Sequence, residues 1–183
     1  MVRTRNSEHT RAALLAAAAQ ILLEHGSALS LEAVAKAAGV SKGGLLHHFP
    51  SREALLTELA LSVATHFHRR LETALEEEVA RHGRQPGAWL RAYIRVNFEP
   101  DANETSLILA LSSLVHGDDY LQRSLELQAT YVAAAENDGL PPGRAHAIRL
   151  ACDGYWMGQF MERTRLSPEQ AQALKEELLS WTR

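Results

Sequence analysis

Residues 39–49 read "GVSKGGLLHHF" and bring together side chains whose types and spacing suit binding of a polyanion. Lys42 supplies a positive charge at the start of a short predicted helix, and two histidines end it. Gly43 and Gly44 stand between them, although glycine costs about 1 kcal/mol relative to alanine inside a helix. The pattern predicts a helix start that is small, bare and cationic, where unpaired backbone N–H groups suit a phosphate.

The elements that position this stretch are two short helices with a tight turn between them. Ser30 is the predicted cap of a helix over 31–38, and Gly39 ends that helix. Ser41 then caps the helix over 42–48. Two such helices joined by Gly-Val-Ser predict a helix-turn-helix, whose second helix enters the major groove of DNA.

The end of the second helix carries polar and apolar side chains with different expected roles. His47 and His48 can reach phosphates or base edges by hydrogen bonds. Phe49 is expected to anchor the helix against the first helix of the chain. Arg3 and Arg5 are expected to form a flexible arm that adds phosphate or minor-groove contacts.

The whole chain has helical periodicity and no convincing strand, so the predicted fold class is all-α. Ser167, Pro168 and Gln170 form a predicted capping box at the start of the last helix. The helix from residue 52 to 81 should be about 45 Å long, enough to belong to both ends of the protein. The nine predicted helices cover residues 8–25, 31–38, 42–48, 52–81, 86–98, 103–115, 118–138, 143–164 and 168–182.

Composition excludes several classes of protein. The 183 residues are 46% hydrophobic but only 6% aromatic, which reflects heavy use of alanine and leucine. No apolar run approaches the roughly 18 residues of a membrane span, and the run at 12–23 is too short for a secretory signal. The single cysteine, Cys152, excludes an intramolecular disulfide and suits a reducing cytoplasm. We therefore expect a cytoplasmic protein with no membrane partner.

Charge is distributed unevenly along the chain. Residues 1–52 carry six basic and three acidic side chains, a net of +3, and four of the nine histidines. The rest of the chain carries 13 basic and 19 acidic side chains, a net of −6. A basic end on an acidic body indicates that only this end meets a polyanion, although chance surface charge is the alternative.

The stretch "LSLEAVAKAAGVSKGGLLHHFPSREALL" (29–56) closely resembles the DNA-binding signature of the tetracycline-repressor (TetR) family of bacterial regulators. The matching positions include Ser30, Val34-Ala35, Ala38 to Ser41, Gly43, Leu45, His48 to Glu53, Leu55-Leu56, and upstream Ala18, Leu22 and Gly26. One position departs from the family pattern, because Leu46 stands where an aromatic residue, usually tyrosine, often reaches a phosphate.

The resemblance implies a homodimeric repressor that grips a pseudo-palindromic operator and is released by a small-molecule effector. It implies a DNA-binding domain at 1–50, an effector and dimerisation domain at 51–183, and no enzyme activity, cofactor or metal. The DNA contacts expected from it are Ser30, Ser41, Lys42, Gly43, His47, His48 and Arg52. Two alternatives remain. The protein could be a small-molecule binding protein or enzyme, or it could be a DNA-binding protein that has no effector or that activates transcription.

Aromatic and polar residues of the body helices are the candidate effector contacts. Their helices surround the effector cavity in the resembled family, and aromatic groups with a few polar ones suit a ligand pocket. The alternative for each of them is ordinary core packing. The candidates are His66, Phe67, Trp89, Tyr93, Leu107, Leu111, Tyr131, Tyr155, Trp156 and Gln159.

The last two helices carry the candidate dimer surface. Small residues at steps of four, three and four leave one face of the helix over 143–164 almost bare, and a stripe on the final helix is similar. Intrachain packing is the alternative, because such stripes do not name their partner. The candidates are Ala147, Ala151, Gly154, Gly158, Ala171, Leu174, Leu178 and Trp181.

Three other patterns favour ordinary roles. His66 and His68 are two residues apart, whereas a chelating pair on a helix needs a spacing of three or four. Cys152 has no base placed near it by the sequence and is expected to be a core residue rather than a nucleophile. The pair Arg69-Arg70 and the run at 76–78 are expected to form a solvated helix face.

Overall fold

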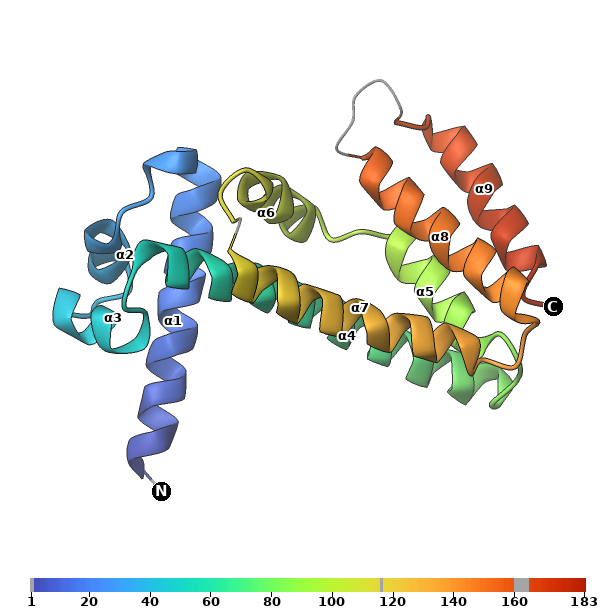
Figure 1. Ribbon diagram of the computed structural model, residues 1–183, viewed down its shortest axis with the longest axis horizontal. Helices are drawn as coiled ribbons and strands as arrows, with labels where there is room; N and C mark the ends of the chain where they lie inside the picture. Colours follow the sequence, from blue (N-terminus) through green and yellow to red (C-terminus); the bar gives the residue numbers. More distant parts are fainter. Residues whose placement is uncertain (1, 116, 160–164) are drawn as a thin grey trace. The chain divides into compact units, whose positions relative to one another are not determined.

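The computed structural model describes the backbone of residues 2–115, 117–159 and 165–183, and side chains from residue 7 onward within these ranges. The chain forms two compact units. The first unit contains Met1–Ala64 and Ala102–Arg123, and the second contains Thr65–Asp101 and Ser124–Arg183. Figure 1 shows the course of the chain through its helices.

The first unit is built on the helix-turn-helix. It contains α1 (Val2–His25), a 3₁₀ turn (Gly26–Ala28), α2 (Leu31–Ala37), α3 (Lys42–His48), the first part of α4 (Arg52–His82), α6 (Ala102–Ser112) and the start of α7 (Asp118–Glu136). In this unit α1 packs against α2 and α6, and α2 packs against α3. Gly39, at φ +68°, makes the turn between α2 and α3 in a backbone region that favours glycine.

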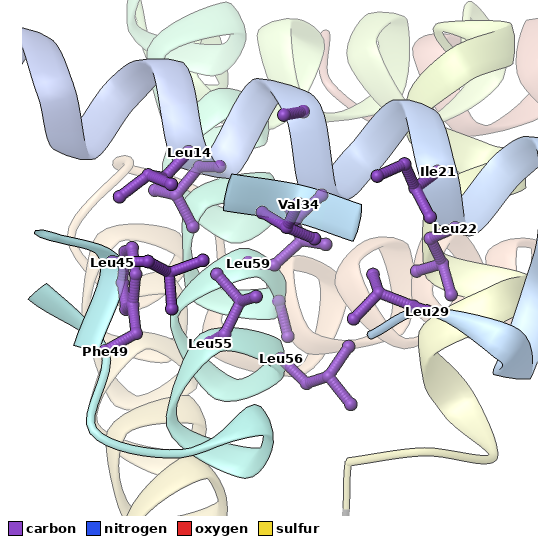
Figure 2. Packing of buried hydrophobic residues seen from close by; sticks show 14 of the residues in the cluster. Leu14, Ile21, Leu22, Leu29, Val34, Leu45, Phe49, Leu55, Leu56 and Leu59 are labelled. Carbon is purple, nitrogen blue, oxygen red and sulfur yellow. The ribbon is translucent and has the colours of Figure 1, made fainter. Parts of the chain in front are cut away.

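A single apolar core holds these helices together. Figure 2 shows Leu14 of α1, Val34 of α2 and Leu45 of α3 pointing toward one another, with leucines of α4 completing the layer. These side chains are fully or almost fully buried. Burying one leucine contributes about 1.5–3 kcal/mol. Because α3 contributes Leu45 to this shared core, the packing holds α3 in a fixed orientation relative to α1 and α2.

The second unit contains the rest of α4 and α7 together with α5 (Ala88–Phe98), α8 (Pro142–Gly158) and α9 (Pro168–Ser180). In it α5 packs against both α8 and α9. Leu90, Ile94 and Ile148 are fully buried in its core. The carboxylate of Asp138 accepts hydrogen bonds from the backbone N–H groups of Trp89 and Leu90 at 2.9 and 2.8 Å, so it caps α5 from the end of another helix.

The all-α prediction is confirmed: the described residues form nine α-helices and no strand. The second helix of the helix-turn-helix has the predicted bounds, and the caps at Ser30, Ser41 and Ser167 are present, the last as a full capping box. The largest difference is at the start, where α1 begins at Val2 rather than at residue 8, so the predicted flexible arm is helical in its backbone. The end of the predicted helix 143–164 falls partly on residues 160–164, which lie outside the described ones.

No helix among the described residues is both long enough and apolar enough to cross a lipid bilayer.

Candidate nucleic-acid interface and effector site

The first turn of α3 is open to solvent at its start. Lys42 and Gly43 are both exposed. A Cβ atom built on Gly43 would meet no atom within 4 Å, and its φ does not lie in the left-handed region. Nothing inside the described chain therefore requires glycine at this position. The N–H of Gly44 is capped by Ser41, whereas the N–H groups of Lys42 and Gly43 have no acceptor among the described residues and lie at the positive end of the helix dipole.

The serine hydroxyls at the helix starts act on their own chain. The Oγ of Ser30 accepts a hydrogen bond from the N–H of Ala33 at 3.2 Å, and the Oγ of Ser41 accepts one from the N–H of Gly44 at 3.0 Å. Both serines remain exposed. A cap hydroxyl can still donate its own hydrogen, so these residues can serve the fold and a phosphate together.

The remaining turns of α3 separate anchoring from exposed side chains. Leu45 and Phe49 are buried, and the guanidinium of Arg11 lies 5.5 Å from the Phe49 ring centroid. The Phe49 anchor is thus confirmed. Leu46 is 39% exposed and His47 is exposed, whereas His48 is half-buried with its ring 6.3 Å from that of Phe49.

Arg52, predicted to contact DNA, makes two hydrogen bonds within the chain. Its Nε donates to the carbonyl of Leu29 at 3.0 Å and its Nη2 to the carbonyl of Ser27 at 3.1 Å. These carbonyls belong to the connection between α1 and α2. Arg52 therefore fixes this connection, and a lysine could not make the same forked contact.

A carboxylate joins three helices of the first unit. Glu58 of α4 pairs with Arg11 of α1 and, at 2.6 Å, with Arg123 of α7. Hydrogen bonding to Glu58 raises the pKa of Arg123 above its ordinary value. Arg123 also lies 3.6 Å from Asp119 on its own helix. The sequence contained no signal for this network, because its members are far apart along the chain.

Four of the predicted effector residues form an aromatic cluster in the second unit. Trp89 stacks on Tyr93 with ring centroids 4.9 Å apart. Phe67 lies edge-on to Tyr93 and Tyr131, at 6.2 and 6.0 Å. The ring of His68, which was not among the predicted contacts, stacks on Tyr131 at 6.0 Å. Tyr93 and Tyr131 are 3% and 4% exposed and belong to the core of the second unit, which is the packing alternative, whereas Phe67 and Trp89 are half-buried against this core.

A polar group borders the cluster. The hydroxyl of Tyr93 donates to Asp153 at 2.5 Å, and Arg149 donates to the other oxygen of that carboxylate at 2.5 Å. Burial, and then the negative charge of Asp153, raise the pKa of Tyr93 above its ordinary value, so the phenol stays neutral. The sequence analysis missed Arg149 and Asp153, although their spacing of four residues on a helix was a usable signal.

The other predicted effector residues lie elsewhere. Leu111 is buried in the core of the first unit and Leu107 packs against that core, which is the packing alternative. Tyr155 stacks on Phe98 at 4.1 Å, apart from the cluster. His66 lines a groove described below. Trp156 and Gln159 are half-buried near the end of α8.

Some residues of the predicted dimer surface are buried within the chain, and others are exposed. Leu178 is 1% exposed and packs in the core of the second unit, while Ala151 and Leu174 pack against this core. These three follow the intrachain alternative. Ala147, Gly154 and Trp181 are exposed, whereas Gly158 and Ala171 are half-buried. Leu150 and Met157, which the sequence analysis did not select, are 57% and 55% exposed on α8.

No group of three or more potential metal ligands occurs within the described part of the chain. Cys152 is buried, and burial raises its pKa to about 12. The thiol is therefore poorly suited to act as a nucleophile.

Comparison with known proteins identifies the family. Residues 14–59 match the family "Bacterial regulatory proteins, tetR family", and residues 87–183 match "Tetracyclin repressor-like, C-terminal domain". No curated protein matches the chain.

Solved structures share the fold over nearly the whole chain. NalD, the secondary repressor of the MexAB-OprM multidrug efflux pump in Pseudomonas aeruginosa, is 19% identical, with 97% of each chain covered and a TM-score of 0.67. A transcriptional regulator from Rhodococcus sp. Rha1 is 20% identical, with 94% of this chain and 95% of that chain covered and a TM-score of 0.69. The multidrug binding protein EbrR, complexed with malachite green, is 20% identical, with 94% and 98% covered and a TM-score of 0.64. With its helix-turn-helix and a C-terminal domain that matches over 87–183, the chain belongs to the TetR family of DNA-binding transcriptional regulators.

Proposed function

We propose that the protein is a homodimeric repressor that holds a palindromic operator with α3 of each subunit and releases it when a small aromatic effector binds. The observation that carries this proposal is the first turn of α3. It pairs an exposed lysine with a glycine whose missing side chain has no reason within the described chain.

On DNA, the start of α3 approaches the phosphate backbone. Lys42 acts through charge, and Gly43 allows the main chain to come close. Ser30, Ser41, His47 and His48 add hydrogen bonds to phosphates or base edges. Arg52 contributes through the α1–α2 connection that it holds, and a phosphate contact is its second role.

The second copy is expected to cover the exposed apolar face of α8. Ala147, Leu150, Gly154 and Met157 recur at steps of three and four, so they share one face of the helix. Small residues on this face allow close approach of two helices, and the large ones supply apolar area. Binding to successive major grooves would require the two copies of α3 in the dimer to lie about 34 Å apart, one turn of DNA.

The effector is expected to bind against the aromatic cluster of Phe67, Trp89, Tyr93 and Tyr131. Flat aromatic faces favour a planar ring, and cationic rings gain from cation–π attraction. The complex of the similarly folded EbrR with malachite green, an aromatic compound, supports this choice of ligand class.

Release is expected to travel along α4 and α7, which contribute residues to both units. Phe67 and Tyr131 place one ring of the cluster on each of these helices. Within the first unit Glu58 and Arg123 tie the same two helices together at 2.6 Å. A ligand that shifts either helix would therefore change the spacing of the two copies of α3.

The direct test retains DNA fragments from the source genome on the purified protein and then titrates one retained duplex across salt concentrations. Lys42→Ala should weaken binding and lower the salt slope by about one unit. Arg84→Ala, which removes an exposed cation of the second unit, is the matched control and should leave the slope unchanged. Absence of any retained duplex in dilute buffer would end the proposal.

The effector arm is tested separately. Malachite green should quench tryptophan fluorescence and release the retained duplex, and Trp89→Phe should reduce the quenching. A duplex that stays bound at saturating dye, while the dye quenches the protein, would separate ligand binding from regulation.

A further inference from the structure

A groove of about 650 Å³ lies between α4 and the end of α5, wholly within the second unit. Its lining is dominated by cations: Arg69, Arg70, Arg81 and Arg95, with His66 beside them. Glu77 and Glu99 are the carboxylates of the lining. From the sequence, Arg69-Arg70 was expected to be a solvated helix face; Arg69 is exposed and Arg70 half-buried, and both line a concave surface.

Both carboxylates of the lining are already paired, Glu77 with two arginines of the lining and Glu99 with a lysine outside it. Glu77 accepts from Arg81 at 3.0 Å and from Arg95 at 2.9 Å through the same oxygen. Glu99 accepts from Lys175 of α9 at 2.6 Å. One carboxylate therefore serves two arginines, and the other is satisfied by a lysine outside the lining.

The backbone and its neighbours hold two of the arginines in place. Arg95 donates to the carbonyl of Ala74 at 2.9 Å, so its guanidinium is fixed across the groove. Arg70 donates to the backbone carbonyl of Glu99 and lies 3.5 Å from that of Val96. Arg69 makes no ion pair or hydrogen bond with any described residue. The groove thus combines positioned donors with a cation that has no acceptor.

The charge of the groove is opposite to that of its surroundings. The second unit as a whole carries 12 basic and 14 acidic side chains, a net of −2. The groove carries four arginines and two carboxylates, a net of +2. A local excess of like charge repels itself and is stabilised when an anion enters.

We propose that this groove binds a multivalent oxyanion, a small molecule with two or more negative charges on phosphate or carboxylate groups. Guanidinium groups bind both phosphate and carboxylate groups through pairs of parallel N–H donors. The volume is in the range of pockets for metabolites or drug-sized ligands rather than a lone inorganic ion.

The site is distinct from the two sites proposed above. Phe67, the neighbour of His66 on α4, joins the aromatic cluster, while His66 joins the groove. The DNA-contacting turn of α3 belongs to the first unit. The proposal does not depend on DNA binding or on the aromatic effector.

Calorimetric titration of the full chain without DNA tests the proposal. The probes are inorganic pyrophosphate and citrate, which separate phosphate from carboxylate chemistry, with sodium chloride at matched ionic strength as the blank. We expect one binding event per chain for at least one probe. Arg69→Ala should lower the affinity about tenfold, and Arg69→Lys should lose less because the charge remains.

Two control variants keep the result interpretable. Arg84→Ala removes an exposed arginine of the same unit outside the groove, and Lys42→Ala removes the cation at the start of α3; both should bind the probe as the unchanged protein does. Arg69 is exposed, so its replacement should leave the circular dichroism spectrum and the unfolding midpoint unchanged. Equal affinities for all four variants, no heat above the chloride blank, or loss of binding in Lys42→Ala alone would overturn the proposal.

Discussion

The replacement Gly43→Ala should move stability and DNA affinity in opposite directions. Gly43 is the second residue of α3, has no positive φ, and has open space where a Cβ would be built. Alanine is favoured over glycine within a helix by about 1 kcal/mol, and less in the first turn. We therefore expect the free energy of unfolding to rise by about 0.5–1 kcal/mol.

The same methyl group should weaken the complex with DNA. In the proposed complex it would hold the first-turn N–H groups further from the phosphate that they bind. Loss of a hydrogen bond to a charged group is worth about 1.5–3 kcal/mol, which corresponds to roughly a 10- to 100-fold lower affinity. Urea unfolding followed by tryptophan fluorescence gives the first quantity, and fluorescence anisotropy of a labelled operator duplex gives the second.

Gly44→Ala provides the matched comparison one residue later. A Cβ at Gly44 would lie 3.3 Å from the Oγ of Ser41, the atom that caps the helix. Crowding of the cap should offset the propensity gain, so this variant should be less stable than Gly43→Ala. If Gly43→Ala destabilises the protein, or leaves operator affinity unchanged, the glycine is not explained by close approach to DNA.

Four further outcomes follow from particular contacts. Burial acts to raise the pKa of Glu78, but the hydrogen bond and charge of Arg91 outweigh it, so the pKa is lowered from 4.5. The unchanged protein should therefore be more stable than Glu78→Gln at neutral pH, and this difference should shrink as the pH falls below 4.5. Urea titrations at several pH values measure it. Cys152 should react with a coloured disulfide reagent only as the protein unfolds, because the thiol is buried; fast labelling of the folded protein would contradict its burial. If the proposed dimer forms through α8, Leu150→Glu should shift it to monomer in sedimentation velocity, and unchanged sedimentation would remove this face of α8 from the interface. Asp138→Ala should lower the free energy of unfolding by about 1–2 kcal/mol, measured by urea unfolding, because two N–H groups of α5 lose their acceptor.

Local signals were sufficient for the helix-turn-helix. Ser30, Gly39 and Ser41 each act within a few residues of the chain, as caps or as a turn with positive φ, so their roles could be predicted from spacing alone. Helix bounds were less predictable where capping comes from elsewhere, as with Asp138 and α5.

The second unit was predicted less well because its site depends on which helices pack together. Leu107 and Leu111 have the apolar character expected of pocket residues, but α6 belongs to the first unit, where they pack in the core. Leu178 has the spacing of an interface stripe and is buried instead. Periodicity identifies a buried face without naming its partner, and the partner decides between core, pocket and dimer surface.

The sequence also does not show which cationic side chains bind within the chain and which remain available to a ligand. Lys42, Arg52 and Arg69 are all charged residues on predicted helices, and their residue types do not distinguish them. In the structure Arg52 donates to two carbonyls of its own chain, whereas Lys42 is exposed and Arg69 has no described acceptor beside a concave surface. Charge that a chain uses internally stabilises its fold, and charge left without an acceptor remains available to a ligand. Lys42 and Arg69, in separate units, are therefore two positions where removal of a single charge should weaken binding while leaving the fold intact.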